Sequence, residues 1–379
     1  MNQNNKIAIT DIKSIYTSDY KLYNENGKYP QYCNIIDKFW EKTNTGYKHA
    51  PVIALEELFS KKNIEHLKSI GQKKGKNALI IASGTSEWAG SSNLHSNIHK
   101  DYNIKLPYIN LINIIAGTYA NKIDWTDYIS TDATACASSY KAFYEAELLI
   151  KSGEADRVIV IGVDDQINSY VTELFGFLKN SLTAENEHKG LKPSAFDNIN
   201  QGFRLGHGIG YVVFESDYSL TQTNNSPIAF IKGTVLNGEK LSNPFGQSED
   251  GNGYANVIKS ILNKTNLDKS DISFIKTHGT GTSSNNTAEK NGIESVFSKN
   301  FIATSYKPEI GHTLGSNGIV ELSIAIEDSK NGFVRGIKNR TIKDNNFLSY
   351  DKKMDIKNIM LLASGMGNVY ASSIVEINK

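Results

Sequence analysis

Cysteine is scarce in this sequence, and so are long hydrophobic runs and any excess of one charge. The two cysteines among 379 residues, Cys33 and Cys136, lie far apart and cannot make a disulfide framework or a cysteine metal site. No apolar run approaches the ~20 residues that cross a bilayer. The first residues, MNQNNKIAIT, lack the basic-then-apolar pattern of a secretion signal. With 41 basic and 40 acidic residues, the formal charge of +1 indicates no nucleic-acid partner. We therefore expect a protein of the reducing cytoplasm, without a membrane span or a bound metal.

Short apolar runs rich in β-branched residues alternate with helical periods along the chain. These runs predict buried strands that begin near residues 6, 78, 157, 209, 228, 272, 359 and 372. Helices are expected over 51–70, 254–264 and 287–299, where apolar residues recur on one face. Continuous apolar strands between helices indicate an α/β fold whose sheets are covered on both faces. The polar stretch 216–227 is the best boundary between two similarly built halves.

Cys136 lies in the stretch DATACASS, residues 132–139, where small side chains would leave its sulfur uncovered. The residues before it are β-prone, and those after it have helical periodicity up to Gly153, which suits a helix C-terminus. Cys136 is therefore predicted at a strand-to-helix junction, where the positive end of the helix would lower the thiol pKa below ~8.5. A cysteine is also commonly a small buried apolar residue. From this stretch alone, a nucleophile and a core thiol both remain open.

Two histidines in the second half lie in surroundings rich in glycine and threonine. His278 follows an apolar strand in KTHGTGTSSNNTAE, and His312 lies in KPEIGHTLGSNGIVE, where a helix is expected to begin at Leu314. Glycines beside a histidine keep the backbone open to a ligand, and threonine hydroxyls can hydrogen-bond an extended polar chain. Each histidine alone could be an ordinary core or surface imidazole. Together with a junction cysteine in the other half, they suggest one shared site.

These motifs resemble those of the β-ketoacyl synthases, the condensing enzymes of the thiolase superfamily, in their elongating Cys-His-His form. The resemblance rests on TACASSYKAFYEAELLIKSGEADRVIVIG, on HGTGT followed by Glu289, and on KPEIGHTLGSNGIVE, with support from SAFDNINQGFRLGHGIGYVVFE and SGMGNVYASSIVE. It implies a five-layered α-β-α-β-α thiolase-like fold with two pseudo-duplicated halves. Residues 1–217 would form the half with the cysteine, and residues 218–379 the half with the histidines.

The resemblance implies a decarboxylative Claisen condensation of an acyl thioester with malonyl-acyl carrier protein, in fatty-acid, polyene or polyketide biosynthesis. Cys136 would first take the acyl group, which divides a difficult coupling into two easier steps. Neutral His278 and His312 would then donate hydrogen bonds to the enolate oxygen that decarboxylation leaves. Lys307, with Glu321 as its partner, would set the field and orientation around the histidines, although a merely structural ion pair is the alternative for Glu321.

The resemblance also assigns residues around the reacting groups. The backbone N–H groups of Cys136 and Met366 would form the oxyanion hole. Thr280 and Thr282 would bind the pantetheine arm. Leu111 lies in the stretch that lines the acyl pocket in relatives, and Met366 stands where the family usually has a Phe that gates this pocket.

Three positions depart from the family pattern. Met366 replaces the gating Phe with a slimmer and more flexible side chain, so altered acyl selectivity is a reasonable hypothesis. His207 stands where Glu is usual, and Asn286 replaces an Asp after the threonine loop. These differences point away from the housekeeping fatty-acid branch, and none of them touches the catalytic set.

The implied partners are an acyl carrier protein and a second subunit, either an identical chain or a related ketosynthase-like one; no cofactor is implied. Carrier proteins are acidic, so a local basic patch is expected, with Lys61, Lys62 and Lys68 as candidates. Two other functions compete. An auxiliary subunit could retain these motifs while shaping the acyl pocket of a partner. A cysteine-dependent thioester hydrolase would use Cys136 with one histidine, but it would leave the second histidine and Lys307 without a role.

Overall fold

The computed structural model describes residues 6–16, 22–23, 31–32, 55–56, 58–85, 111–164, 190–199, 202–206 and 208–378. Its strands are β1 (Ile7–Tyr16), β2 (Leu22–Tyr23), β3 (Gln31–Tyr32), β4 (Asn77–Ala82), β5 (Tyr128–Asp132), β6 (Arg157–Val163), β7 (Gly208–Glu215), β8 (Ala229–Gly238), β9 (Ile272–Lys276), β10 (Ala303–Thr304), β11 (Phe333–Val334), β12 (Lys352–Lys353), β13 (Asn358–Gly365) and β14 (Val369–Ile377). Its α-helices are α3 (Lys61–Gly71), α6 (Ile112–Ile123), α7 (Ser138–Ser152), α10 (Asp217–Thr223), α11 (Asn252–Thr265), α12 (Ser283–Phe297), α13 (Lys307–Ile310) and α14 (Asn317–Lys330).

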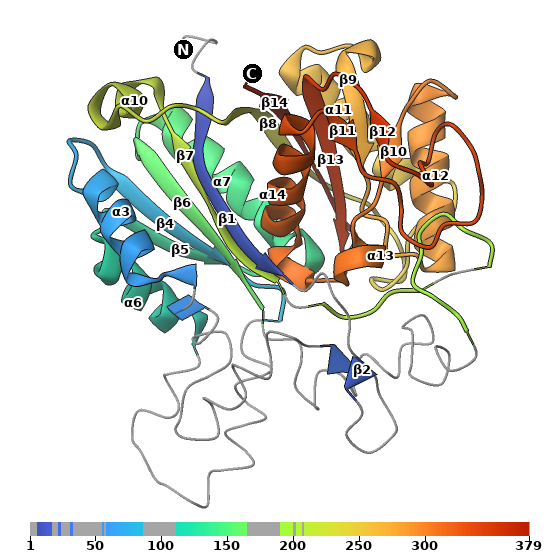
Figure 1. Cartoon of the computed structure of the whole chain (residues 1–379), viewed down its shortest axis with the longest axis horizontal. Coiled ribbons are helices and arrows are strands. Elements are labelled where there is room, and N and C mark those ends of the chain that lie inside the picture. The colour runs from blue at the N-terminus through green and yellow to red at the C-terminus, as the bar shows by residue number, and fades with distance from the viewer. Residues whose placement is uncertain are drawn as a thin grey trace, which may run out of the picture.

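Ten of these strands form one sheet, in the order β10-β9-β13-β14-β8-β1-β7-β6-β4-β5. The first half of the chain contributes the end from β1 to β5, and the second half contributes the end from β8 to β10. In Figure 1, α7 and α14 lie between these two parts of the sheet, α3 and α6 cover one outer face, and α11 and α12 cover the other.

The alternation of side chains along β4 explains the layers of the first half. Leu79 and Ile81 pack in a core cluster with α3 and α6, whereas Ala78 and Ile80 face the cluster that contains α7 and α14. All four are fully buried, and burial of a Leu or Ile side chain contributes about 1.5–3 kcal/mol. A strand that is apolar on both faces can only lie between two helical layers.

In the second half, alternate side chains of β13 likewise face two different core clusters. Ile359 and Leu361 join the middle cluster, and Met360 and Leu362 join a third cluster with residues of α11 and α12. The three clusters therefore separate five layers, and the expected α-β-α-β-α arrangement is confirmed.

The strand β1 joins the two parts of the sheet. It pairs antiparallel with β7 from Ala8 to Tyr16 and with β8 from Ile7 to Ile9. The polar stretch 216–227 contains the short helix α10 between these two neighbours. The division into residues 1–217 and 218–379 stays a prediction.

Most of the expected elements are present, and one is wrong in extent. Every predicted strand is found, and α11 contains the helix expected over 254–264. The helix expected over 287–299 corresponds to α12, which ends two residues earlier, at Phe297. The helix expected over 51–70 is instead broken at Ser60, whose hydroxyl accepts the Asn63 N–H (3.5 Å) and so caps α3. No helix in the described ranges is both long and apolar enough to cross a bilayer.

Candidate active site

Cys136 lies in a strained turn between β5 and α7, at the predicted strand-to-helix junction. A 3₁₀ turn, η1 (Ala135–Ala137), connects the two elements, and Ala135 has a φ of 48°. The left-handed region is unfavourable for a residue with a Cβ, and such strain is often found at functional sites. The Ser138 hydroxyl stabilises the turn, because it accepts the Thr134 N–H (2.9 Å) and donates to the Ala135 carbonyl (2.7 Å).

A second turn of the same kind precedes α14. The 3₁₀ turn η3 (Leu314–Ser316) begins with Leu314 at a φ of 45°, two residues after His312. The Asn317 side-chain amide, at the start of α14, donates to the Cys136 carbonyl (3.3 Å). The turns that carry the cysteine and the second histidine are therefore packed together, each at the start of a middle-layer helix.

A buried carboxylate that the sequence analysis did not identify connects the second turn to the segment after β4. Asp164, just after β6, accepts the Ser83 hydroxyl (2.8 Å) and the backbone N–H groups of Gly84 and Thr85 (each 2.9 Å). It also accepts the Gly315 N–H of the second turn (2.6 Å). Burial raises the pKa of the Asp164 carboxyl, and these donors oppose the rise. An acidic residue directly after the apolar run RVIVIGV was the available signal.

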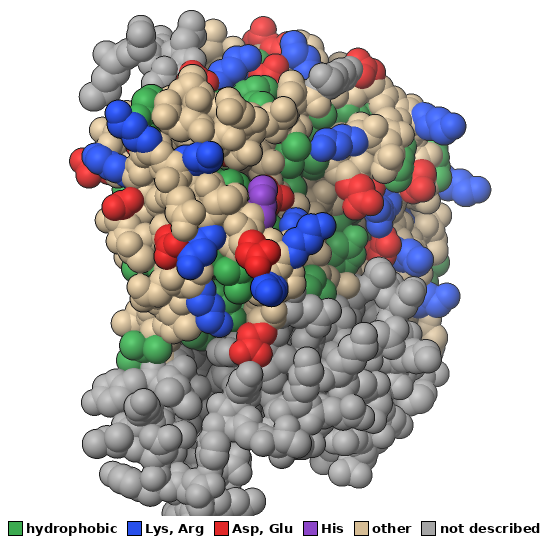
Figure 2. Space-filling model, turned by 60° about the vertical axis from the view of Figure 1, so that its left-hand side comes forward, with side chains coloured by type: hydrophobic (Ala, Val, Ile, Leu, Met, Phe, Trp, Pro, Cys, Tyr) green, Lys and Arg blue, Asp and Glu red, His purple; other side chains and the backbone are tan. Residues whose placement is uncertain are grey.

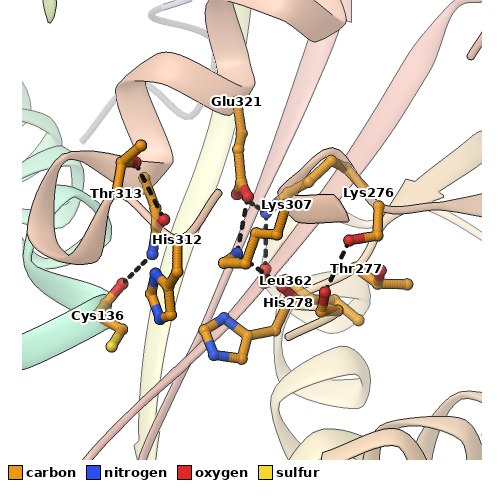
Figure 3. Close-up of polar contacts among 12 residues, drawn as sticks. Cys136, Lys276, Thr277, His278, Lys307, His312, Thr313, Glu321 and Leu362 are labelled. Carbon is orange, nitrogen blue, oxygen red and sulfur yellow. Dashed lines mark hydrogen bonds and ion pairs between the residues drawn. The ribbon is translucent and has the colours of Figure 1, made fainter. Parts of the chain in front are cut away.

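The two histidines and the cysteine face one space. The rings of His278 and His312 are 5.7 Å apart between centroids and nearly perpendicular, at 83°. Both residues are buried, and Figure 3 shows the Cys136 sulfur beside the His312 ring, with the His278 ring next to it. The Phe203 ring packs against His312 at 5.5 Å, a neighbour that the sequence did not reveal. The structure thus brings together three residues that are far apart in the chain.

The backbone sets the orientation of His312. The Leu314 N–H donates to Nδ1 of this ring (3.1 Å). A neutral imidazole has one N–H donor and one acceptor, so the proton lies on Nε2. Nδ1 of His278 is buried and has no hydrogen-bond partner among the described residues. Both rings can therefore serve a bound molecule.

Both imidazoles are uncharged near neutral pH, as expected. Burial lowers the pKa of His278 well below its usual value, and the positive charge of Lys307 lowers it further. The pKa of His312 is lowered well below its usual value by the same two causes in the same order. Because a protonated imidazole would be unfavourable here, each ring acts as a neutral hydrogen-bonding group.

The expectation of a lowered thiol pKa is wrong. Cys136 keeps some exposed surface, but the sulfur lies in dense surroundings, and burial raises the pKa of its thiol to about 12. The charge of Lys307 opposes this rise, and the carboxylate of Asp164 adds to it. Desolvation thus outweighs the favourable field at the start of α7, and the resting cysteine is a thiol.

Behind the histidines lies a buried cluster of three charged side chains, here called the charge triad: Lys276, Lys307 and Glu321. The Lys307 ammonium donates to one oxygen of Glu321 (2.7 Å) and to the His278 carbonyl (2.6 Å). The Lys276 ammonium contacts the other oxygen. Each of the three is at most 1% exposed. Burial lowers the pKa of Lys307, and Glu321 opposes this. The sequence analysis missed Lys276, although a lysine that ends the apolar run ISFI was visible.

The threonine loop after His278 is anchored by Glu289 of α12. The Glu289 carboxylate accepts the backbone N–H groups of His278 (2.5 Å) and Gly279 (2.8 Å). The Thr280 and Thr282 hydroxyls are 3.2 Å apart, and Thr282 is the N-cap of α12. The pantetheine-binding role of the two threonines stays a prediction.

Met366 and Leu111 are the two residues that the resemblance assigned to the acyl pocket. Met366, in the turn between β13 and β14, is 52% exposed. A Cβ on the preceding Gly365 would lie 2.7 Å from the Thr134 carbonyl, so this turn packs directly on the cysteine turn. Leu111 precedes α6, in an outer layer. The oxyanion-hole, acyl-pocket and gate roles stay predictions.

Asn286 belongs to α12, and Lys61, Lys62 and Lys68 belong to α3. The Asn286 amide lies 3.5 Å from the Gly281 carbonyl, and His207 lies outside the described residues. Lys61 and Lys68 of α3 approach Glu65 (4.0 Å) and Asp124 (3.4 Å). On the face shown in Figure 2, acidic side chains lie among the basic ones. The docking role of Lys61, Lys62 and Lys68 stays a prediction.

In the described part of the chain, no group of three or more His, Cys, Asp or Glu side chains could hold a metal ion.

Comparison with known proteins gives matches along most of the chain. The family model for the beta-ketoacyl synthase N-terminal domain matches residues 52–219, and the model for the C-terminal domain matches residues 228–339. The mitochondrial 3-oxoacyl-[acyl-carrier-protein] synthase of Arabidopsis thaliana is 26% identical over 276 residues, which are 69% of this chain and 59% of that protein. The 3-oxoacyl-[acyl-carrier-protein] synthase 2 of Rhizobium meliloti is 28% identical over 225 residues, or 58% of this chain and 53% of that protein. The chain spans about half the length of the curated relatives it matches.

Solved structures share the fold. A type II polyketide synthase acyl-carrier protein in complex with its ketosynthase gives a TM-score of 0.78 at 16% identity, covering 99% of this chain and 100% of that one. The ishigamide ketosynthase/chain length factor gives 0.78 at 17% identity, with the same coverage. The expected thiolase-like architecture is thereby confirmed.

Proposed function

Because the chain belongs to the β-ketoacyl synthase family of the thiolase superfamily, we propose that it catalyses decarboxylative Claisen condensation of an acyl thioester with malonyl-acyl carrier protein. The observation that carries this proposal is the convergence of Cys136 with two neutral histidines on one space. A nucleophile alone would suit many acyl transfers. A pair of uncharged N–H donors beside it suits a reaction in which an enolate must form.

In the first step, Cys136 takes the acyl group from its carrier. The Cys136 sulfur forms a bond to the acyl carbon, the bond between that carbon and the carrier sulfur breaks, and the thiol proton leaves with the carrier thiol. His312 is not well placed as a base, because its Nδ1 already accepts the Leu314 N–H and its Nε2 holds the proton. The backbone N–H groups of Cys136 and Met366 would stabilise the tetrahedral oxyanion. Each donor of this kind contributes about 2.7–4 kcal/mol.

In the second step, the malonyl unit loses carbon dioxide. The electron pair of the broken carbon–carbon bond passes to the thioester oxygen as an enolate, and His278 and His312 donate hydrogen bonds to that oxygen. The enolate carbon then attacks the acyl carbon on Cys136, the bond to sulfur breaks, and the thiolate regains a proton. Neutral rings suit this step, because their N–H groups stabilise a transient charge and remain protonated.

Lys307 and Glu321 would act through His278 as positioning residues. The Lys307 ammonium contacts the His278 carbonyl, and Glu321 neutralises part of its charge. Their contacts are to the His278 carbonyl, to each other and to Lys276, so a position-holding role follows more directly than proton transfer.

The partners are also proposals. One comparison structure contains a carrier protein bound to its ketosynthase, and another contains a ketosynthase with a chain length factor. We propose a carrier protein for this chain and a dimer with itself or a related subunit, in the cytoplasm. Within the described residues β5 pairs only with β4 and forms the end of the sheet, where Tyr128 and Ile129 are exposed. An apolar edge strand favours pairing with a second subunit.

One experiment distinguishes the three candidate functions. Purified protein is incubated with malonyl-carrier and a panel of acyl-carriers, and both the protein and the products are analysed by mass spectrometry. A condensing enzyme acquires one acyl group on Cys136 and releases a β-ketoacyl product. Acylation followed only by free acid identifies the hydrolase, and no acylation identifies an auxiliary subunit. His278→Ala and His312→Ala should still acylate and should lose condensation, whereas Cys136→Ala should lose both.

A further inference from the structure

Lys276 is a fully buried charged residue to which the proposed mechanism assigns no role. It is the last residue of β9, it is fully buried, and it lies in the centre of the molecule. Its ammonium contacts Glu321 and donates to the Leu362 carbonyl of β13 (3.0 Å), and the Tyr140 ring lies 5.6 Å away. A buried ammonium is costly unless it is paired and hydrogen-bonded.

The charge triad contains one more positive charge than negative charge. Glu321 uses one oxygen for Lys307 and the other for Lys276, so a single carboxylate serves two ammonium groups. Glu289 is the nearest other carboxylate described for this loop, and its oxygens accept the backbone N–H groups of His278 and Gly279. An ion pair with one lysine would be enough to neutralise the charge of Glu321. The second lysine therefore adds positive charge behind the two histidines.

The contacts of Lys276 join three segments of the site. His278 lies two residues further along the same strand end. Leu362 belongs to β13, which leads to Gly365 and the turn on Cys136. Glu321 belongs to α14, whose preceding turn carries His312. A single side chain at this point thus fixes the relative positions of the nucleophile and both histidines.

We propose that Lys276 is a positioning residue for decarboxylation, which holds the two histidines in register with Cys136 and places a second positive charge behind them. This rests on the proposed function for its role in turnover, although its effect on the histidines can be measured without turnover. It identifies a residue outside the set that the family resemblance assigned.

The electrostatic surroundings support this role. For His278, burial lowers the pKa most, and Lys307, His312 and Lys276 follow in that order. For His312, burial and Lys307 lower the pKa, the Asn317 hydrogen bond raises it, and Lys276 lowers it. Three described carboxylates lie around this region: Glu321 pairs with Lys276, Glu289 accepts the His278 N–H, and Asp164 accepts the Gly315 N–H. Removal of the Lys276 charge would leave Glu321 fully matched by Lys307, so the pKa of both histidines should rise.

The test uses Lys276→Met, because methionine has a side chain of similar length to lysine and carries no charge. Histidine labelled with ¹³C at the ring is titrated by NMR, and the signals among the eight histidines are assigned with His278→Asn and His312→Asn. In the wild type, both signals should keep the neutral shift across the range in which a free imidazole, with a pKa of about 6.5, becomes protonated. In Lys276→Met, their midpoints should move to higher pH. Titration curves that superimpose on the wild type overturn the proposal.

Turnover gives the second readout. The acid limb of kcat/KM for condensation should move to higher pH in Lys276→Met, and its neutral-pH value should fall about tenfold or more, because small misplacements of catalytic groups cost up to about a hundredfold. Lys276→Gln keeps a donor for Glu321 and Leu362 without the charge, so it should recover part of the neutral-pH rate while its acid limb stays shifted. If Lys276→Met does not fold, the titration of Lys276→Gln decides.

Lys264→Met is the matched control. Lys264 of α11 pairs with the buried Glu147 of α7 (2.9 Å), and none of its described contacts is to Cys136, His278, His312 or the charge triad. Its removal should change neither the histidine titrations nor the acid limb. If the protein does not condense at all, the proposed function fails, but the histidine titrations still test the role of Lys276.

Discussion

Glu321→Gln is the substitution for which the structure predicts the largest loss of stability. Glu321 is fully buried, and each of its oxygens contacts a buried ammonium, from Lys276 and Lys307. Removal of one partner from a buried ion pair costs about 3–5 kcal/mol, because the other charge stays buried without compensation. Glutamine has nearly the same volume, so no cavity contributes. The loss should reach at least this range, which is a large part of the ~5–15 kcal/mol that stabilises a typical fold.

Urea unfolding measures this loss. The midpoint should fall strongly while the slope of the unfolding free energy against urea stays unchanged, since the surface exposed on unfolding is the same. Addition of Lys276→Met to Glu321→Gln should recover part of the stability. In the single variant two buried ammonium groups lack a carboxylate partner, whereas in the double variant only one does.

Glu65→Gln is the control, because its partner Lys61 lies 4.0 Å away and both side chains are well exposed. It should have no measurable effect, as expected for surface pairs. If Glu321→Gln is no less stable than this control, or if the double variant is less stable than Glu321→Gln, the account of the charge triad is refuted.

Two further predictions concern the cysteine turn. Because the Cys136 thiol has a pKa of about 12, its alkylation by iodoacetamide should quicken about tenfold per pH unit between about pH 6 and 10; peptide mass spectrometry measures the rate, and a plateau in that range would contradict the burial argument. Gly84→Ala should lose about 1–3 kcal/mol, because its Cβ would lie 2.8 Å from the Gly315 nitrogen and 2.9 Å from the Ala135 oxygen. Gly117→Ala, in α6, should instead gain about 0.5–1 kcal/mol, because no described atom beyond the neighbouring residues and the helix backbone lies within 4 Å of the new Cβ. Equal unfolding free energies for the two variants would exclude the proposed close approach.

The elements and the reactive residues could be predicted from sequence, because local patterns specify them. Runs of β-branched residues mark strands that are buried on both faces, so β4, β6 and β13 begin within one residue of their predicted starts. The junction at Cys136 was visible because an extended segment changes to helical periodicity within a few residues. The glycine-rich surroundings of His278 and His312 singled out both histidines. In contrast, the helix break at Ser60 was missed, because the apolar period continues through this capping residue.

The protonation state of Cys136 and the residues that hold the site in place depended on the tertiary structure. The field at a helix start, which is local, predicted a lowered thiol pKa for Cys136, but desolvation by distant segments outweighs it and raises the pKa. Asp164 and Lys276 look like ordinary charged residues at strand ends, and only their contacts with Gly315, Leu362 and Glu321 show that they hold the site together. Burial and pairing of charges arise between segments that are far apart in the chain, so their energies depend on packing rather than on sequence neighbours. Sequence alone therefore singled out the groups proposed to react, and the packed fold decided their protonation and their relative positions.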